Sequence, residues 1–280
     1  MKLGHAIHNE RVIRKINLIN VGKKIASASI LSRFERDQTM INSQSLFKLM
    51  QRLCGGVGNL ELLFRNSDPD DLYASVLLAI KSGEDEMQQL ELYLRQQIKH
   101  DSWPYYSLTA TLLAAELSNE GSHKQPSADD VHDAATYLLR LKHPMTYDYL
   151  LYSSLTLYFN AEDLTGLSKR VIGCFRQGDD GNLLKREFAV QGMTLAILAL
   201  IAAGFGAEAR RQWQYVKTID LNSQQLETAI YRKIIMLQLN RGRRKQADFE
   251  QDWQLLLDGV QETDLSKRVA NLYRRFVLKK

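Results

Sequence analysis

Apolar residues recur at spacings of three and four along most of the chain, which predicts a protein built from helices. Beyond residue 70 this spacing runs through residues 72–80, 87–98, 105–115 and 147–159. Alternating β-branched runs bounded by Asn-Gly turns, the usual signal for paired strands, are missing. No proline follows Pro144, so helices can continue to the end of the chain without this helix breaker. We therefore predict an all-α fold.

The first 66 residues predict five short helices, over residues 3–14, 18–24, 28–36, 45–53 and 60–66. Asn17 and Ser27 can cap the second and third of these helices, and either Asn42 or Ser43 can cap the fourth. A helix stop and restart around Pro69 then separates two domains. We place a helix-turn-helix domain at 1–66 and a helical domain at 70–280.

A weak internal repeat appears in the second domain, where small residues and a tryptophan return after about 38–40 residues. The first copy consists of Gly204, Ala209 and Trp213, and the second of Gly242, Ala247 and Trp253. Small residues let paired helices approach closely, and tetratricopeptide repeats have a period of about 34 residues. We expect a tetratricopeptide-like right-handed helical repeat, with a plain helical bundle as the alternative.

Positive charge is concentrated in the first domain. Residues 1–66 carry 11 lysines and arginines against 4 aspartates and glutamates, a net charge of +7, whereas the whole chain has +5. Residues 67–280 therefore sum to −2. This asymmetry is typical of a basic module that meets phosphates, although charge alone also fits a merely solvated basic face.

The predicted helix 28–36 has the character of a DNA recognition helix. Leu31 and Phe34 should face the core, while Ser29, Arg33 and Arg36 fall on another face. A recognition helix enters the major groove with its N-terminal end first, and small residues there allow close approach.

Within this arrangement the basic residues are expected to contact different parts of the DNA. Arg33 can bond the O6 and N7 atoms of a guanine, which reads sequence. Arg36, Lys23 and Lys24 are better placed for phosphates, which fix register. The expected DNA-contacting residues are Ala28, Ser29, Arg33, Arg36, Lys23 and Lys24.

Glu35 is the acidic residue of the same helix. We expect it to pair with Arg11 of the first helix and to lock the two helices together, with an exposed surface acid as the alternative.

The stretch from Leu3-Gly4 to Arg36 resembles the N-terminal domain of the Rgg/GadR/MutR family of Gram-positive transcription regulators, and Ser32-Arg33-Phe34-Glu35-Arg36 is its strongest element. Weaker matches follow at Leu46, Leu49 and Leu53, at Tyr147-Asp148-Tyr149-Leu150 and at Leu157-Tyr158-Phe159. The resemblance implies a homodimer whose C-terminal repeat domain often binds a short peptide pheromone on its concave face.

The chain departs from that family at several positions. Asp37 and Lys24 stand where Gly is usual, and Gly22 stands where Ala is usual. Gly22 should weaken its helix by about 1 kcal/mol, and Asp37 should bring a negative charge near the phosphates. Ser43 stands where some members have a cysteine that links the dimer, so we expect no such disulfide.

No ligand residue is assigned from the sequence. Related regulators often hold a peptide backbone with asparagine amides, but the helices at 150–159 and 193–203 contain none. Several residues could line a pocket or simply pack between helices, namely Tyr149, Tyr152, Tyr158, Lys185, Arg186, Arg232 and Lys233.

Other chemistry is not expected. His5 and His8 lie three apart but lack a third metal ligand, and the glycines at 55–58 lack the Gly-Lys-Ser/Thr of a phosphate loop. No nucleophile-base constellation is present, so we expect no enzyme activity, cofactor or metal. Cys54 and Cys174 are interpreted as reduced thiols. The apolar run 193–203 is too short to span a membrane, and no signal peptide is visible, so a cytoplasmic location is expected.

These observations predict a sequence-specific regulator that binds double-stranded DNA as a homodimer, because one recognition helix reads few base pairs. Its activity would be gated by a short peptide. The alternative is a helical-repeat interaction protein whose helix-turn-helix is vestigial, as the Gly22 and Asp37 departures suggest.

Overall fold

The computed structural model describes residues 3–13, 15–53, 72–100, 104–121, 125–142, 144–177, 182–223, 225–241, 246–261 and 265–274. The chain separates into two compact units, Met1–Leu78 and Ala79–Lys280, and the division falls within helix α6 (Leu72–Ser82). The domain boundary predicted at 66–70 lies outside the described residues. The described parts hold helices and no strand, which confirms the all-α prediction.

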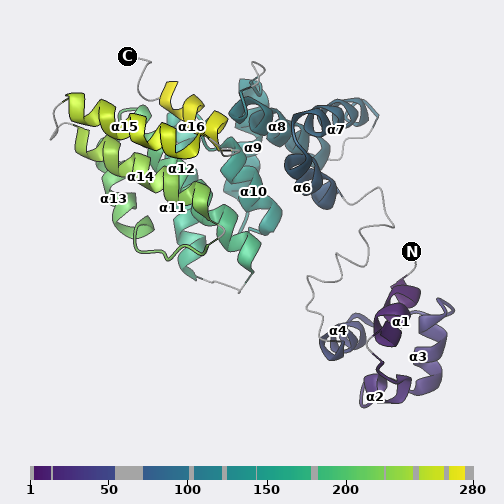
Figure 1. Cartoon of the computed structure of the whole chain (residues 1–280). Helices are drawn as coiled ribbons and strands as arrows, with labels where there is room; N and C mark the ends of the chain where they lie inside the picture. The colour runs from purple at the N-terminus through teal and green to yellow at the C-terminus, as the bar shows by residue number, and fades with distance from the viewer. Residues whose placement is uncertain are drawn as a thin grey trace. The chain divides into compact units, whose positions relative to one another are not determined.

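The N-terminal unit contains α1 (Leu3–Ile13), α2 (Leu18–Gly22), α3 (Ala28–Glu35) and α4 (Ser43–Arg52) (Figure 1). The helix predicted at 60–66, Cys54 and the glycines at 55–58 lie outside the described residues. Caps set the starts of three helices, because the side chains of Asn17, Ser27 and Asn42 accept backbone N–H groups of the first turn. Since Asn42 is the cap, α4 begins two residues earlier than predicted.

The core of this unit lies between the four helices. α3 packs against both α1 and α2, and α2 also contacts α4. The buried side chains at the centre are Ile7, Val21, Leu31, Phe34, Leu49, Met50 and Leu53. Burial of this apolar surface is the main stabilising term for so small a unit, and it holds α3 by one face only.

Gly4 allows α1 to dock directly on the end of α3. A Cβ atom at this position would lie only 1.8 Å from the carbonyl oxygen of Phe34. The backbone N–H of Gly4 also donates to Oδ1 of Asp37 at 2.9 Å. Asp37 thus supplies a partner for one of the N–H groups that a helix N-terminus leaves without an intrahelical acceptor.

The three departures from the family pattern therefore have structural roles or costs. Asp37 and Lys24 have φ angles of +56° and +63°, the left-handed region that favours glycine. Gly22 leaves space for Leu31, because a Cβ there would lie 2.3 Å from Leu31 Cδ1. The space that a methyl group at position 22 would take is filled by the Leu31 side chain, so α2 packs closely on α3.

The C-terminal unit is made of helices that alternate between two rows (Figure 1). One row contains α8 (Pro104–Asn119), α10 (Thr146–Leu155), α12 (Leu183–Ala202) and α14 (Leu226–Asn240), each in contact with the next. The other contains α9 (Ala128–Arg140), α11 (Ala161–Gln177) and α13 (Gly206–Val216). This alternation of neighbouring helix pairs is a helical repeat rather than a closed bundle.

Three further helices complete the unit. α7 (Glu84–Gln97) packs on α8, and α15 (Gln246–Val260) packs on α16 (Ser266–Tyr273). α16 also contacts α8, about 150 residues earlier in the chain. The repeat therefore curves, because its last described helix, α16, returns to α8.

Candidate DNA-binding surface and ligand cavity

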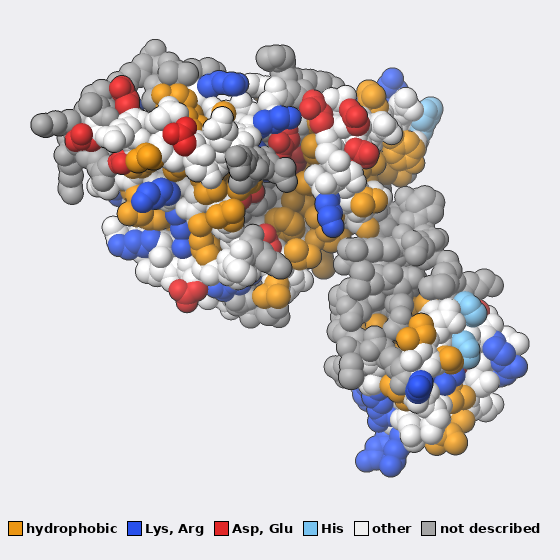
Figure 2. All heavy atoms as spheres, viewed as in Figure 1, with side chains coloured by type: hydrophobic (Ala, Val, Ile, Leu, Met, Phe, Trp, Pro, Cys, Tyr) orange, Lys and Arg blue, Asp and Glu red, His pale blue; other side chains and the backbone are white. Residues whose placement is uncertain are grey.

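The exposed face of α3 carries the residues expected to contact DNA. Ala28, Ser29, Arg33 and Arg36 are all exposed, and so are Lys23 and Lys24 in the turn between α2 and α3. Basic side chains stand out on this unit in Figure 2. The structure thus brings all six predicted residues onto one helix and the turn before it.

The turn before α3 is held by the helices around it. The backbone N–H groups of Ile25 and Ala26 both donate to the carbonyl of Gly22, which closes the turn after α2. Arg52 of α4 donates to the carbonyl of Val21 at 2.9 Å. Because these bonds satisfy the last carbonyls of α2, Lys23 and Lys24 project from a fixed backbone.

Glu35 and Arg11 lie side by side in the structure and join α3 to α1. Arg11 Nε donates to Glu35 Oε1 at 2.6 Å and Arg11 Nη2 to Oε2 at 2.7 Å, a bidentate arrangement. His8 Nδ1 lies 2.8 Å from the second oxygen. The carboxylate is only 7% exposed, so it is not a surface acid.

The charge state of this pair follows from its surroundings. Burial raises the pKa of Glu35, but the hydrogen bonds from Arg11 and His8 outweigh it and hold the pKa below its ordinary value. The Glu35 carboxylate raises the pKa of Arg11 in turn, against the opposing effect of burial. The pair therefore stays ionised at neutral pH and fixes the orientation of α3.

A metal site at His5 and His8 finds no support in the described side chains. The two rings stack with centroids 6.2 Å apart, and His8 is engaged with Glu35. No group of three potential metal ligands occurs among the described residues.

None of the described helices is long and apolar enough to cross a bilayer.

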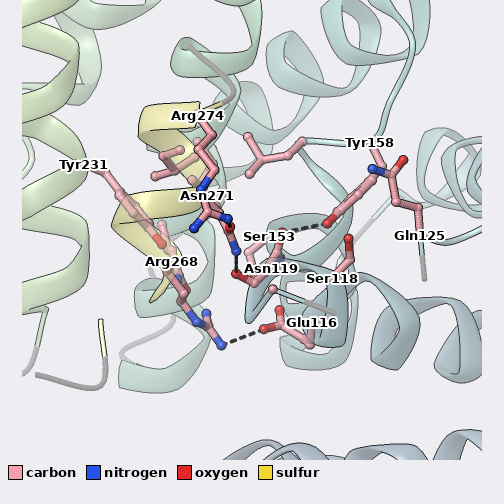
Figure 3. Close-up of a pocket in the computed structure, with 15 residues that line it drawn as sticks. Glu116, Ser118, Asn119, Gln125, Ser153, Tyr158, Tyr231, Arg268, Asn271 and Arg274 are labelled. Carbon is pink, nitrogen blue, oxygen red and sulfur yellow. Dashed lines mark hydrogen bonds and ion pairs between the residues drawn. The ribbon is translucent and has the colours of Figure 1, made fainter. Parts of the chain in front are cut away.

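The C-terminal unit contains a cavity of about 450 Å³ between the first row and α16 (Figure 3). This volume falls in the range of small-molecule and cofactor pockets, about 300–1,000 Å³. The lining comes from α8, α10, α12, α14 and α16 and from the segments that follow α8, α10 and α16. It consists of Glu116, Ser118, Asn119, Gly121, Gln125, Ser153, Leu157, Tyr158, Gln191, Leu195, Tyr231, Arg268, Asn271, Leu272 and Arg274.

Close packing of the wall helices shapes this cavity. At Gly192 of α12, a Cβ atom would lie 2.5 Å from the Tyr152 ring and 3.2 Å from Cα of Ser153. α10 and α12 therefore touch at backbone distance there. Ser153 of α10, Leu157 just after the end of α10 and Gln191 of α12 all contribute to the lining near this contact.

One guanidinium at the edge of the cavity serves three carboxylates. Arg268 of α16 bonds Glu116 of α8 at 2.9 Å and Glu227 of α14 at 3.3 Å, and it also bonds Glu120. Arg268 is only 16% exposed, and although burial opposes it, these carboxylates raise its pKa well above the ordinary value. The cluster fastens α16 to helices far away in the sequence.

Asparagine amides form a second network on the cavity wall (Figure 3). Asn271 Nδ2 donates to the backbone carbonyl of Asn119 at 2.9 Å, and the hydroxyl of Tyr158 donates to Oδ1 of Asn119 at 2.9 Å. Arg274 donates to Oδ1 of Asn271. These bonds hold both amides in fixed positions on the cavity wall.

Most of the pocket residues considered from the sequence have other positions. Only Tyr158 lines the cavity, whereas Tyr149 and Tyr152 are buried between helices. Arg232 donates to the carbonyls of Val216 and Ile219. Lys185, Arg186 and Lys233 are not part of the lining.

The two cavity asparagines lie outside the central helices 150–159 and 193–203, where a ligand-binding asparagine was expected. Asn119 ends the apolar run of α8, and Asn271 lies in a short amphipathic helix near the C-terminus. A polar residue of this kind at the end of a buried helix was the available signal. The contact between α8 and α16 that brings them together has no local signal.

Comparison with known proteins shows the same fold at low identity. The Streptococcus dysgalactiae SHP pheromone receptor Rgg2 matches with a TM-score of 0.73 and 15% identity, over 98% of this chain and 100% of that one. PrgX in its complex with cCF10 matches with 0.68 and 15%, over 100% and 93%. ComR from S. thermophilus, in complex with DNA and its signalling peptide ComS, matches with 0.55 and 10%, over 97% and 99%.

No protein-family model matches the sequence, and the curated proteins give no significant match. The structural matches extend over both units, so the order of a helix-turn-helix unit followed by a helical repeat is confirmed. The resemblance to the Rgg/GadR/MutR family is thus confirmed at the level of the fold.

Proposed function

We propose that this chain is a sequence-specific DNA-binding transcription regulator that reads the major groove with α3. The observation that carries the proposal is the exposed face of α3, where Arg33 lies between small residues and basic ones while the opposite face is locked into the core. Rigid support of this kind is what a base-reading side chain needs to discriminate between base pairs.

Competition for DNA tests this proposal. Fragments of genomic DNA are bound to the purified full chain, and a large excess of random-sequence DNA is then added. The proposal expects a few fragments to remain bound, because specific sites are held at least about 10³-fold more tightly than random DNA. Equal displacement of every fragment would instead favour an interaction module with a vestigial helix-turn-helix.

The regulator works as a homodimer in the cytoplasm under this proposal. One eight-residue recognition helix reads only a few base pairs, and two-fold pairing extends the site to two half-sites. Light scattering should give twice the chain mass of 32.1 kDa at micromolar concentration. A complex with selected DNA whose mass corresponds to one protein chain per DNA duplex would exclude the paired arrangement.

A short peptide bound in the cavity gates DNA binding under the same proposal. Asn119, Asn271, Gln125 and Gln191 place amide side chains around the cavity, and amides can both donate to and accept from a peptide backbone. The proteins with this fold include one whose complex contains a signalling peptide and DNA together. Differential binding of the peptide to two states of the chain would shift its DNA affinity.

A library of short random peptides, pooled from synthesis, tests the gate on the full chain. The proposal expects some pools to change the affinity for selected DNA, and Asn271→Ala to abolish that response. Asn240→Ala serves as the matched control, because Asn240 lies on α14, donates to the carbonyl of Met236 in its own helix and is not part of the cavity lining. An equal response from both variants would place the peptide elsewhere.

A further inference from the structure

Ile30 is a large apolar side chain on the exposed face of α3. It is 47% exposed, whereas Leu31 and Phe34 of the same helix are each 1% exposed. Ile30 is also a weaker helix former than Arg, Lys, Gln or Glu, which an exposed position would accept. Helix propensity therefore does not account for isoleucine here, and about half of its surface is open to a ligand.

The helix places Ile30 beside the base-reading arginine. Residues three apart on a helix are neighbours, about 5–6 Å between Cβ atoms, so Ile30 and Arg33 are adjacent on the surface of α3. Helical side chains also lean toward the N-terminus, which is the end that enters the groove. When Arg33 reaches one base edge, Ile30 lies over a neighbouring base pair.

The chemistry of the major groove identifies what an isoleucine can read there. Among the base-edge groups exposed in that groove, the C5-methyl of thymine is the apolar one, and the others are hydrogen-bond donors or acceptors. We propose that Ile30 determines specificity for a thymine, through contact with its C5-methyl group, close to the base pair read by Arg33. This inference rests on the proposed function of α3.

Replacement of thymine by deoxyuridine removes only the methyl group and tests the contact. In an operator selected with the full chain, each thymine is replaced in turn by deoxyuridine. The wild type should lose affinity about four-fold at one thymine of each half-site, the factor expected for one methyl group leaving an apolar contact. Ile30→Ala should bind the thymine and the deoxyuridine operators equally.

Ile19→Ala is the matched control, because Ile19 is also an exposed isoleucine, at 71%, but lies on α2. This variant should keep the four-fold discrimination of the wild type. Ile30→Ala should remain folded, since the side chain is outside the core and alanine favours helices. Hydrogen exchange of α3 verifies this point.

The two proposals fail in different ways. If an operator is found but Ile30→Ala still discriminates thymine from deoxyuridine, the assignment of Ile30 is wrong while the regulator stands. If no thymine in the operator responds to loss of its methyl group, the assignment is equally wrong. Failure to select any operator would overturn the function of α3 and the role of Ile30 together.

Discussion

A few buried polar contacts fix the orientation of α3. Arg11 and Glu35 form a bidentate pair between α1 and α3, and Asp37, just after α3, accepts the N–H of Gly4 near the start of α1. Removing one partner of a buried pair leaves an uncompensated charge, which is more costly than the pair itself was stabilising. The orientation of the face that we propose to read bases therefore depends on residues outside that face.

Substitution of Glu35 tests this dependence. Glu35→Ala should lower the free energy of unfolding of the N-terminal unit by about 3 kcal/mol, because Arg11 is then left without its carboxylate. Hydrogen exchange of residues 3–53 in the full chain measures the change without relying on the other unit. Unchanged exchange would mean that hydrophobic packing alone positions α3.

The pair also predicts the acid sensitivity of the unit. Because the pKa of Glu35 is lowered in the folded state, its contribution is complete above the ordinary glutamate pKa, about 4.3, and is lost as the pH falls through the folded value. The protection of α3 against exchange, relative to the intrinsic rate at each pH, should fall in this acidic window in the wild type. Glu35→Ala should lack that step.

At the scale of elements, helix docking depends on where side chains are absent. Gly4 allows backbone contact between α1 and α3. Gly173 lies within α11, and a Cβ there would meet no described atom within 4 Å apart from its chain neighbours and the nearby backbone of its own helix. The same residue type is thus required at one site and replaceable at the other.

Two alanine substitutions should have opposite effects for this reason. Gly4→Ala should destabilise the N-terminal unit by about 3 kcal/mol, because the new Cβ overlaps a backbone carbonyl that cannot rotate away. Gly173→Ala should stabilise the C-terminal unit by about 1 kcal/mol through helix propensity. Hydrogen exchange followed separately in each unit during thermal unfolding compares the two variants. If both substitutions lowered stability, the distinction between a required and a replaceable glycine would be refuted.

Local patterns were sufficient for the elements and for the exposed face of α3. The caps at Asn17 and Ser27, the core residues Leu31 and Phe34, and the all-α class all follow from spacing and cap chemistry within a few residues. The cavity was beyond prediction because its wall joins Asn119 and Asn271, whose proximity depends on the accumulated curvature of the whole repeat.

At the scale of the whole molecule, the two parts of the chain differ in net charge. Residues 1–66 carry a net charge of +7, and the rest of the chain sums to −2. Phosphate contacts release counterions, so binding by the basic unit should weaken steeply with salt. The slope of log affinity against log salt concentration gives the number of phosphate contacts.

Lys23→Ala should reduce the slope of log affinity against log salt by about 0.9 for each protomer bound, while leaving sequence preference unchanged. Lys217→Ala is the control, because Lys217 is exposed on the C-terminal unit. Titrations of selected DNA at several salt concentrations measure both slopes. An unchanged slope for Lys23→Ala would remove this lysine from the phosphate contacts.

The central claim is that α3 reads sequence through Arg33. The most direct measurement is capture and sequencing of genomic fragments with purified wild type and with Arg33→Ala. The account predicts that the wild type enriches a few fragments that share a two-fold motif, and that the variant retains salt-sensitive binding without this enrichment. The same enriched fragments in both samples, or uniform recovery by the wild type, would contradict it.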